Sequence, residues 1–364
     1  MTQVIGDAGG WVGFDRFMEL ALYEPGLGYY ASAGAKFGLL PAGQSGRGSD
    51  FVTAPEITPY FGAALATQVA QALEVTGTRE VWEFGAGTGA LAAQLLQALG
   101  ERVDGYTIVD LSGSLQQRQR ELLKPYGSRV RWVDALPTGF RAVVVGNEVL
   151  DAMPVQLLAR RGGVWHERGV VVGAGAQFVW QDRPTGMRPP IDVAGEHDYL
   201  TEIHPHAQAF VSTLADRLLQ GAAFFLDYGF PEREYYHGQR AMGTVMCHRA
   251  HRMDSDPLAD VGQKDITAHV NFTALALAAQ HPPMPVAPGG SSGFGVLGYT
   301  SQARFLINCG LLSLLENASL QQRAMAQKLL MEHEMGELFK VIGFCKGAPW
   351  EAIGFSEGDR THRL

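Results

Sequence analysis

Hydrophobic and polar positions alternate in blocks through the middle of the chain. Short apolar runs, typical of buried strands, are separated by longer segments whose apolar residues recur at helical spacing. The strands predicted in this way cover Glu80–Phe84, Tyr106–Asp110, Val130–Val133 and Ala142–Val145, and the helices cover Ala90–Leu99 and Ser114–Leu123. This alternation predicts an α/β fold in which a mainly parallel sheet carries helices on both faces.

The pattern differs on either side of this block. Helical patches flank a Gly-rich loop in the first 78 residues, and glycine-punctuated strand-like runs after the block predict a hairpin insertion. The remaining predictions are helices at Phe14–Leu22 and Pro59–Leu73, the loop Leu39–Ser49, short strands over Val155–Trp180, helix at Glu202–Leu219, strand at Ala222–Asp227, helices near Thr300–Asn308 and Leu320–Phe339, and a strand near Val341–Cys345. We therefore expect an N-terminal helical region with a lid loop over residues 1–78. A core over 79–364 follows, with insertions at about 155–200 and 229–264.

A glycine-rich turn follows the first strand of the alternating block. The run from Glu83 to Gly89, EFGAGTG, leads directly into the predicted helix at Ala90. Glycines permit positive φ and close approach of a ligand, and the N–H groups at a helix start favour an anionic group. The next predicted strand ends at Asp110, whose carboxylate can accept hydrogen bonds from both hydroxyls of a ribose. Together these features predict a nucleoside-binding site.

The sequence leaves open which nucleoside this is. Gly85, Gly87 and Ala90 satisfy the relaxed dinucleotide fingerprint, so an NAD-dependent oxidoreductase is one alternative, and a purely structural turn is another. Glu83 would repel a pyrophosphate but could hold an ammonium, and Gly89 comes one place early for the fingerprint. S-adenosylmethionine offers an ammonium, a carboxylate, a sulfonium and a ribose without a phosphate. These features favour the methyl donor over the dinucleotide.

Composition excludes some classes of function. The 364 residues carry a formal net charge of −8, which disfavours binding to nucleic acid or to anionic membranes. The three cysteines are widely spaced and indicate a reducing compartment. No targeting pattern opens the sequence and no segment approaches the ~20 apolar residues of a membrane span, so we expect a cytoplasmic protein. The histidines, including His248, His251 and His269, lack zinc-like spacing, and no metal is expected.

The segment Asn147–Pro154 carries the most reactive set of side chains. Asn147, Glu148 and Asp151 follow the fourth predicted strand, at the sheet edge where ligands bind in such folds. If the methyl acceptor is a guanidinium, two carboxylates can bind its fork and leave one nitrogen lone pair able to attack the methyl group. The alternative is that Asn147 caps a helix and Glu148 favours the positive end of that helix.

The run Thr53-Ala54-Pro55-Glu56 matches a capping box. In that arrangement the Thr53 hydroxyl accepts from the third helical N–H while Glu56 accepts from the Thr53 N–H. Local sequence alone therefore predicts a helix start for Glu56 rather than a catalytic role.

Seven motifs in order resemble those of the MidA family, whose mitochondrial members are complex I assembly factors. The motifs are Gly28-Tyr29-Tyr30, Ser49–Ile57 with Phe61-Gly62, the glycine turn, Asn147–Val155, Asp227-Tyr228-Gly229, Gly243-Thr244 and Asp265–Thr273. The resemblance runs from about Tyr23 to Phe344. It implies a class I S-adenosylmethionine-dependent methyltransferase fold with an added N-terminal helical region and insertions.

The resemblance also implies roles for single residues. Gly85, Gly87 and Gly89 would line the donor, Asp110 would take the ribose position and Asp134 the adenine side, while Glu56 and the Asn147-Glu148 pair would lie at the mouth of the active site. For the mitochondrial members it implies symmetric dimethylation of an arginine in a complex I subunit. We therefore predict a protein arginine methyltransferase with Glu148, Asn147, Asp151 and Glu56 as catalytic residues. A small-molecule methyltransferase and a noncatalytic assembly factor are the alternatives.

Overall fold

The computed structural model describes residues 1–31, 53–110, 113–249, 252–280 and 294–364. The predicted loop Leu39–Ser49 and His251 lie outside these residues. In the described part, the largest sheet has eight strands, and most neighbouring strands are parallel. Across the sheet the strands are β15 (Gly295–Ser301), β16 (Phe339–Lys346), β10 (Leu218–Phe230), β5 (Phe140–Asn147), β2 (Glu80–Phe84), β3 (Gly105–Val109) and β4 (Val130–Val133), with β14 (Val270–Asn271) pairing with the end of β10.

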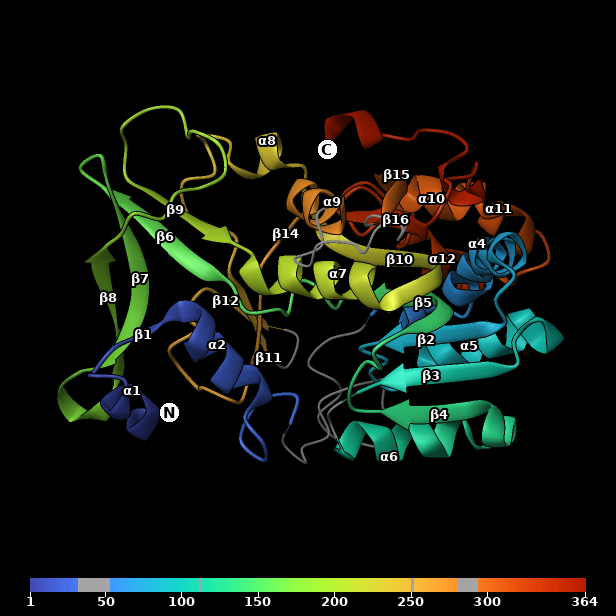
Figure 1. Ribbon diagram of the computed structural model, residues 1–364, viewed down its shortest axis with the longest axis horizontal. Helices are drawn as coiled ribbons and strands as arrows, with labels where there is room; N and C mark the ends of the chain where they lie inside the picture. The colour runs from blue at the N-terminus through green and yellow to red at the C-terminus, as the bar shows by residue number, and fades with distance from the viewer. Residues whose placement is uncertain (32–52, 111–112, 250–251, 281–293) are drawn as a thin grey trace.

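Only β16 runs against its neighbours within this described sheet. It pairs antiparallel with β10 on one side and with β15 on the other, whereas β10, β5, β2, β3 and β4 are parallel to one another. The carboxyl ends of these parallel strands therefore meet at one edge. In Figure 1 the arrowheads of β2, β3 and β4 point toward the side of the molecule that carries α2 and β11.

Helices cover both faces of the sheet, as predicted. Val143 and Val145 of β5 face a core shared with α4 (Tyr60–Thr76), α5 (Ala90–Leu99) and α10 (Gln302–Asn308). The alternate residues Ala142 and Val144 face a second core, shared with α7 (Pro205–Arg217) and α9 (Phe272–Gln280). Because successive side chains of a strand point to opposite faces, the continuous apolar run of β5 serves both cores.

Two smaller antiparallel sheets complete the described strands. One contains β1 (Val12–Gly13), β7 (Val164–Val172), β6 (Gln156–Arg161), β9 (Tyr199–Ile203) and β8 (Phe178–Pro184), and it lies on the far side of the molecule from α5 in Figure 1. The other contains β12 (Arg252–Asp254), β11 (Met246–Arg249) and β13 (Asp265–Thr267). Helix α2 (Phe14–Tyr23) packs against the larger of the two and contributes Phe14 and Phe17 to its core.

The other described helices are short or peripheral. They are α1 (Thr2–Asp7), α3 (Ala54–Ile57), α6 (Gly113–Leu122), α8 (Glu232–Tyr235), α11 (Leu311–Leu314) and α12 (Leu320–Gln327). Among the described helices, none has the length and apolarity that crossing a bilayer would require.

Several predicted element bounds were wrong. Glu202 lies in strand β9 instead of opening a helix, because β9 pairs with β6 there and Pro205 fixes the first turn of α7. The helix predicted over Leu320–Phe339 ends at Gln327, and Phe339 already belongs to β16. Thr300 lies in β15, a strand that the sequence pattern did not predict.

Candidate functional site

A cavity of about 730 Å³ lies beyond the carboxyl ends of β2, β3 and β5. Its wall includes the glycine turn, the end of β3, the segment after β5 and residues next to α2. Six carboxylates are among the described residues that line it, and no lysine, arginine or histidine is. They are Glu56, Glu83, Asp110, Glu148, Asp151 and Asp265. A cavity with this charge favours a cationic ligand and disfavours a pyrophosphate.

The glycine turn opens one side of this cavity. Gly85, Gly87 and Gly89 all have positive φ, at 64°, 52° and 87°. A Cβ at Gly87 would meet no other atom within 4 Å, whereas a Cβ at Gly85 would lie 2.7 Å from Cγ2 of Val149. Gly85 and Gly87 line the cavity, but Gly89 faces Gln119 and is not part of the lining. The turn thus leaves its backbone open to a ligand at Gly87.

Glu83 lies beneath this turn and is only 1% exposed. Its Oε2 accepts a hydrogen bond of 2.6 Å from the Tyr106 hydroxyl. Burial raises the pKa of Glu83 to about 8, with a smaller contribution from the charge of Asp110. The Glu83 carboxyl group is therefore largely protonated at neutral pH, and a nearby cation would favour its ionised form.

Gln119 is a buried residue that the sequence analysis did not single out. Its Nε2 donates to the Gly87 carbonyl at 2.9 Å and to Oδ2 of Asp110 at 2.7 Å, and its Oε1 accepts from the Trp132 indole at 2.8 Å. Gln119 therefore fixes the turn and the Asp110 carboxylate relative to each other. Asp134, predicted to lie at the adenine side, is exposed after β4 and is not among the described residues of the lining.

Asn147 and Glu148 form the opposite wall of the cavity. No helix follows them, so the structure rejects the alternative in which Asn147 is a helix cap. Glu148 has a φ of 55°, a left-handed conformation that costs a non-glycine residue roughly 1–3 kcal/mol. Its Oε1 accepts from Nδ2 of Asn147 at 2.8 Å and from the N–H of Ala54 at 3.4 Å. Burial, then the charges of Asp151 and Glu56, raise the pKa of Glu148 to about 8.

Three buried oxygens of this wall have no hydrogen-bond partner among the described residues. They are Oδ1 of Asn147, Oε2 of Glu148 and Oδ1 of Asp151. A buried acceptor without a donor costs about 1–3 kcal/mol, so a group of three in one cavity indicates a ligand with several N–H donors. Burial raises the pKa of Asp151 to about 6, and its hydrogen bond with Tyr228 opposes this.

Two tyrosines near α2 border the same wall. The rings of Tyr23 and Tyr30 are stacked with centroids 5.5 Å apart. The Tyr30 hydroxyl donates to Oδ1 of Asp265 at 2.7 Å, and the Tyr23 hydroxyl donates to the Ala152 carbonyl at 2.8 Å. Spacing along the chain does not predict the contact between Tyr30 and Asp265, which occur in two separate motifs, because 235 residues separate them and only the fold brings them together.

Glu56 both caps α3 and lines the cavity. The capping box with Thr53 forms as the sequence predicted. Oε1 of Glu56 also accepts a hydrogen bond of 3.0 Å from the Thr88 hydroxyl, in the glycine turn. Burial raises the pKa of Glu56. Glu56 therefore links the N-terminal region to the turn.

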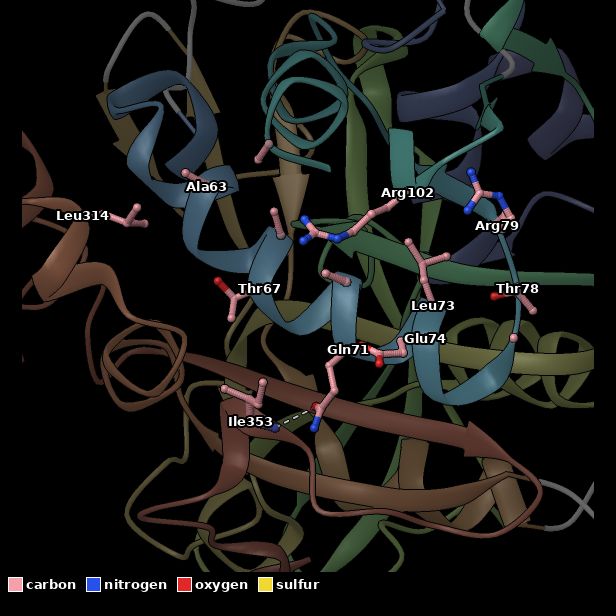
Figure 2. A pocket seen from close by; sticks show the side chains of 14 residues that line it. Ala63, Thr67, Gln71, Leu73, Glu74, Thr78, Arg79, Arg102, Leu314 and Ile353 are labelled. Atoms are coloured by element: carbon pink, nitrogen blue, oxygen red, sulfur yellow. Dashed lines mark hydrogen bonds between the residues drawn. The ribbon is translucent and has the colours of Figure 1, made fainter. Parts of the chain in front are cut away.

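A second cavity, of about 840 Å³, lies against α4, as Figure 2 shows. It is lined mainly by small and aliphatic side chains, such as Ala63, Leu73 and Ile353, and Glu74 is its one carboxylate among the described residues. Although larger, it contains no cluster of unpartnered polar atoms among the described residues. We therefore take the acidic cavity as the candidate site. His248 and His269 line neither cavity in the described structure.

Comparison with known proteins assigns the chain to a family. Residues 64–285 match a family model described as "putative S-adenosyl-L-methionine-dependent methyltransferase". The chain belongs to this family. The methyltransferase resembles a crystal structure from Burkholderia thailandensis bound to S-adenosyl-homocysteine, with 48% identity, a TM-score of 0.91 and coverage of 100% of this chain and 95% of that one.

Curated relatives of the methyltransferase come from animals. A Danio rerio protein, "Protein arginine methyltransferase NDUFAF7, mitochondrial", is 28% identical over 306 residues, which are 74% of this chain and 68% of the relative. The Caenorhabditis elegans homolog of that protein is 25% identical over 296 residues, 72% of this chain and 66% of the relative. The chain thus spans about two thirds of the length of these relatives. The resemblance to the MidA family is confirmed, and S-adenosylmethionine, not NAD, is the cosubstrate of the methyltransferase.

Proposed function

We propose that this methyltransferase transfers a methyl group from S-adenosylmethionine to a guanidinium nitrogen of an arginine in a protein. The observation that carries the proposal is the set of three unpartnered oxygens on Asn147, Glu148 and Asp151 within a cavity that has no cationic lining residue in the described structure. A guanidinium presents five N–H donors in a rigid plane, whereas an ammonium presents three around one point. Acceptors spread over three side chains suit the planar cation better.

The residues of the glycine-turn side would hold the donor. Gly87 leaves room for close approach, Asp110 offers a carboxylate for the ribose hydroxyls, and Glu83 would face a positive charge. When bound, S-adenosylmethionine supplies an electrophilic methyl group on a sulfonium. We also propose that the fold is the class I methyltransferase fold, which the single antiparallel strand β16 between β10 and β15 supports.

The residues of the opposite wall would act on the acceptor. Glu148 and Asp151 would accept N–H bonds from the guanidinium and hold its positive charge on the bound nitrogens, so that the remaining nitrogen keeps a lone pair for attack. The ionised Glu148 carboxylate could also accept the proton that the acceptor nitrogen loses when it is methylated. Asn147 donates to Oε1 of Glu148 and so orients that carboxylate.

The identity of the protein acceptor is a further part of the proposal. The names of the animal relatives support an arginine as the methylated residue. The resemblance to the MidA family suggests a respiratory complex I subunit as the first acceptor to test, with symmetric dimethylarginine as the product. The division at residue 78 and the cytoplasmic location stay predictions.

Mass spectrometry of protein methylarginine, with and without the gene product, tests the acceptor class. The purified protein should also transfer labelled methyl groups from S-adenosylmethionine to a protein in lysate. Glu148→Gln should reduce this labelling at least ~100-fold and leave affinity for S-adenosylhomocysteine within about threefold.

Glu202→Gln is the matched control. Glu202 is also a buried glutamate, but it accepts from the N–H groups of Thr244 and Val245 and does not line the cavity. It should keep wild-type labelling per folded molecule. Equal labelling by wild type and Glu148→Gln would overturn the role of Glu148, and label on lysine or on a small molecule alone would overturn the acceptor class.

A further inference from the structure

Asp227 is a buried carboxylate near the end of β10, and it does not line the cavity. Its Oδ2 accepts hydrogen bonds from three successive backbone N–H groups, those of Val149 at 3.1 Å, Leu150 at 2.8 Å and Asp151 at 3.3 Å. Its Oδ1 accepts from the N–H of Tyr228 at 2.9 Å. The partners of both oxygens among the described residues are N–H donors, which favour the ionised side chain, but burial and the charges of Asp151 and Glu148 outweigh them and raise the pKa of Asp227 well above its ordinary value.

These three N–H groups belong to the loop that carries the acceptor-side residues. Glu148 immediately precedes the first of them, and Asp151 supplies the last. The backbone of Glu148 is in the left-handed region, a conformation that persists only where the surroundings enforce it. Its N–H donates to the carbonyl of Leu226, the residue just before Asp227, at 2.9 Å. The end of β10 therefore contacts every backbone N–H from Glu148 to Asp151.

Other contacts hold the loop Glu148–Asp151 less extensively. The N–H of Ala268 donates to the Asp151 carbonyl at 2.9 Å, and the Asp151 side chain has a hydrogen bond with Tyr228. Neither contact reaches Glu148 or Val149. Among the described contacts, the Asp227 carboxylate is thus the one side chain that binds several consecutive amides of this loop.

We propose that Asp227 is a positioning residue for methyl transfer, which fixes the loop Glu148–Asp151 so that the Glu148 and Asp151 carboxylates meet the acceptor in one geometry. The inference rests on the proposed function, because it assigns these two carboxylates to the acceptor. Asp227 itself would touch neither donor nor acceptor. Its removal should lower kcat and leave donor affinity nearly unchanged, since Gly87 and Asp110 are held separately by Gln119.

Kinetics of Asp227→Ala and Asp227→Asn test this role. We expect Asp227→Ala to lower kcat at least tenfold, with affinity for S-adenosylhomocysteine within threefold of wild type. Asp227→Asn keeps one carbonyl oxygen for the three N–H groups and should retain more activity than Asp227→Ala. In a Glu148→Gln background, Asp227→Ala should cost less than it does in the wild-type background, because one of the two carboxylates to be positioned is already gone. Fully additive losses, or a loss of donor affinity with kcat unchanged, would overturn the proposal.

Hydrogen exchange gives a second readout that needs no activity. Amides of Val149–Asp151 should exchange at least tenfold faster in Asp227→Ala than in wild type, with exchange in α5 unchanged. Glu202→Gln is again the matched control, since it alters a buried carboxylate that binds two backbone amides elsewhere. It should leave exchange at 149–151 at the wild-type rate. Unchanged exchange in Asp227→Ala would refute the anchoring role even if the wild-type protein methylates no arginine, whereas absence of methylation alone would refute only the proposed function.

Discussion

The acceptor should bind more tightly as the pH rises from 6.5 to 8.5. Burial and neighbouring carboxylates raise the pKa of Glu148 to about 8, so the side chain is mostly neutral at pH 6.5. With that pKa, the ionised fraction is ~3% at pH 6.5 and ~76% at pH 8.5. If a guanidinium binds only the ionised form, its apparent Kd falls ~25-fold over this interval. Asp151, with a pKa of about 6, is largely ionised at both ends and adds little.

Isothermal titration can measure this change with a peptide from the acceptor that the labelling experiment identifies. The enzyme is first saturated with S-adenosylhomocysteine, whose thioether has no sulfonium charge that would itself lower the pKa of Glu148. Titrations in buffers of different ionisation enthalpy should show release of nearly one proton per peptide at pH 6.5. Glu148→Gln should remove both the release and most of the change in Kd. A Kd that is equal at both pH values, or an unchanged pH dependence in the variant, would refute the reasoning.

Three further predictions concern the donor side and stability. Gln119→Leu removes two donated hydrogen bonds and should raise the Kd of S-adenosylhomocysteine about tenfold in a titration; an unchanged Kd would contradict its bridging role. Gly85→Ala should lower Tm and donor affinity more than Gly100→Ala, because both have positive φ but only Gly85 would place its Cβ 2.7 Å from another side chain, and equal effects would count against this. The folded-state pKa of Glu83, about 8, exceeds its ordinary value of 4.5, so the folded form binds the proton more strongly. Glu83 therefore lowers the free energy of unfolding increasingly as pH rises from 4.5 to 8. In urea unfolding of the ligand-free protein, Glu83→Gln should make this fall in stability smaller, and an equal fall in the variant would contradict the assignment.

The parts of the fold that the sequence predicts well are those with a local cause. Apolar periodicity predicts β2, β5 and α5. The closely spaced glycines between β2 and α5 predict the turn, because few structures other than a tight turn require them. β15 has no comparable signal. Its residues include Gly295 and Gly298, and it becomes a strand because β16 pairs beside it. Tertiary pairing of this kind overrides local preference.

The site divides in the same way. Asp110, Asn147 and Glu148 could be found because each lies at the end of a strand or directly after it, at the edge where ligands bind. Gln119 lies in the uniformly polar stretch between Leu115 and Leu122 of α6, so nothing local distinguishes it from its neighbours. Its importance comes from contacts made across the sheet edge, which sequence spacing does not reveal.

The position of β16 bears on how the protein is made. This strand lies between β10 and β15, yet it is synthesised after both and after every other described strand of that sheet. Until it emerges from the ribosome, β10 has an unpaired edge, and the apolar residues that β16 would cover stay accessible. A nascent chain that already contains every described residue of the acidic cavity would therefore still need protection by chaperones, and truncation before residue 339 should yield aggregates rather than a less active enzyme.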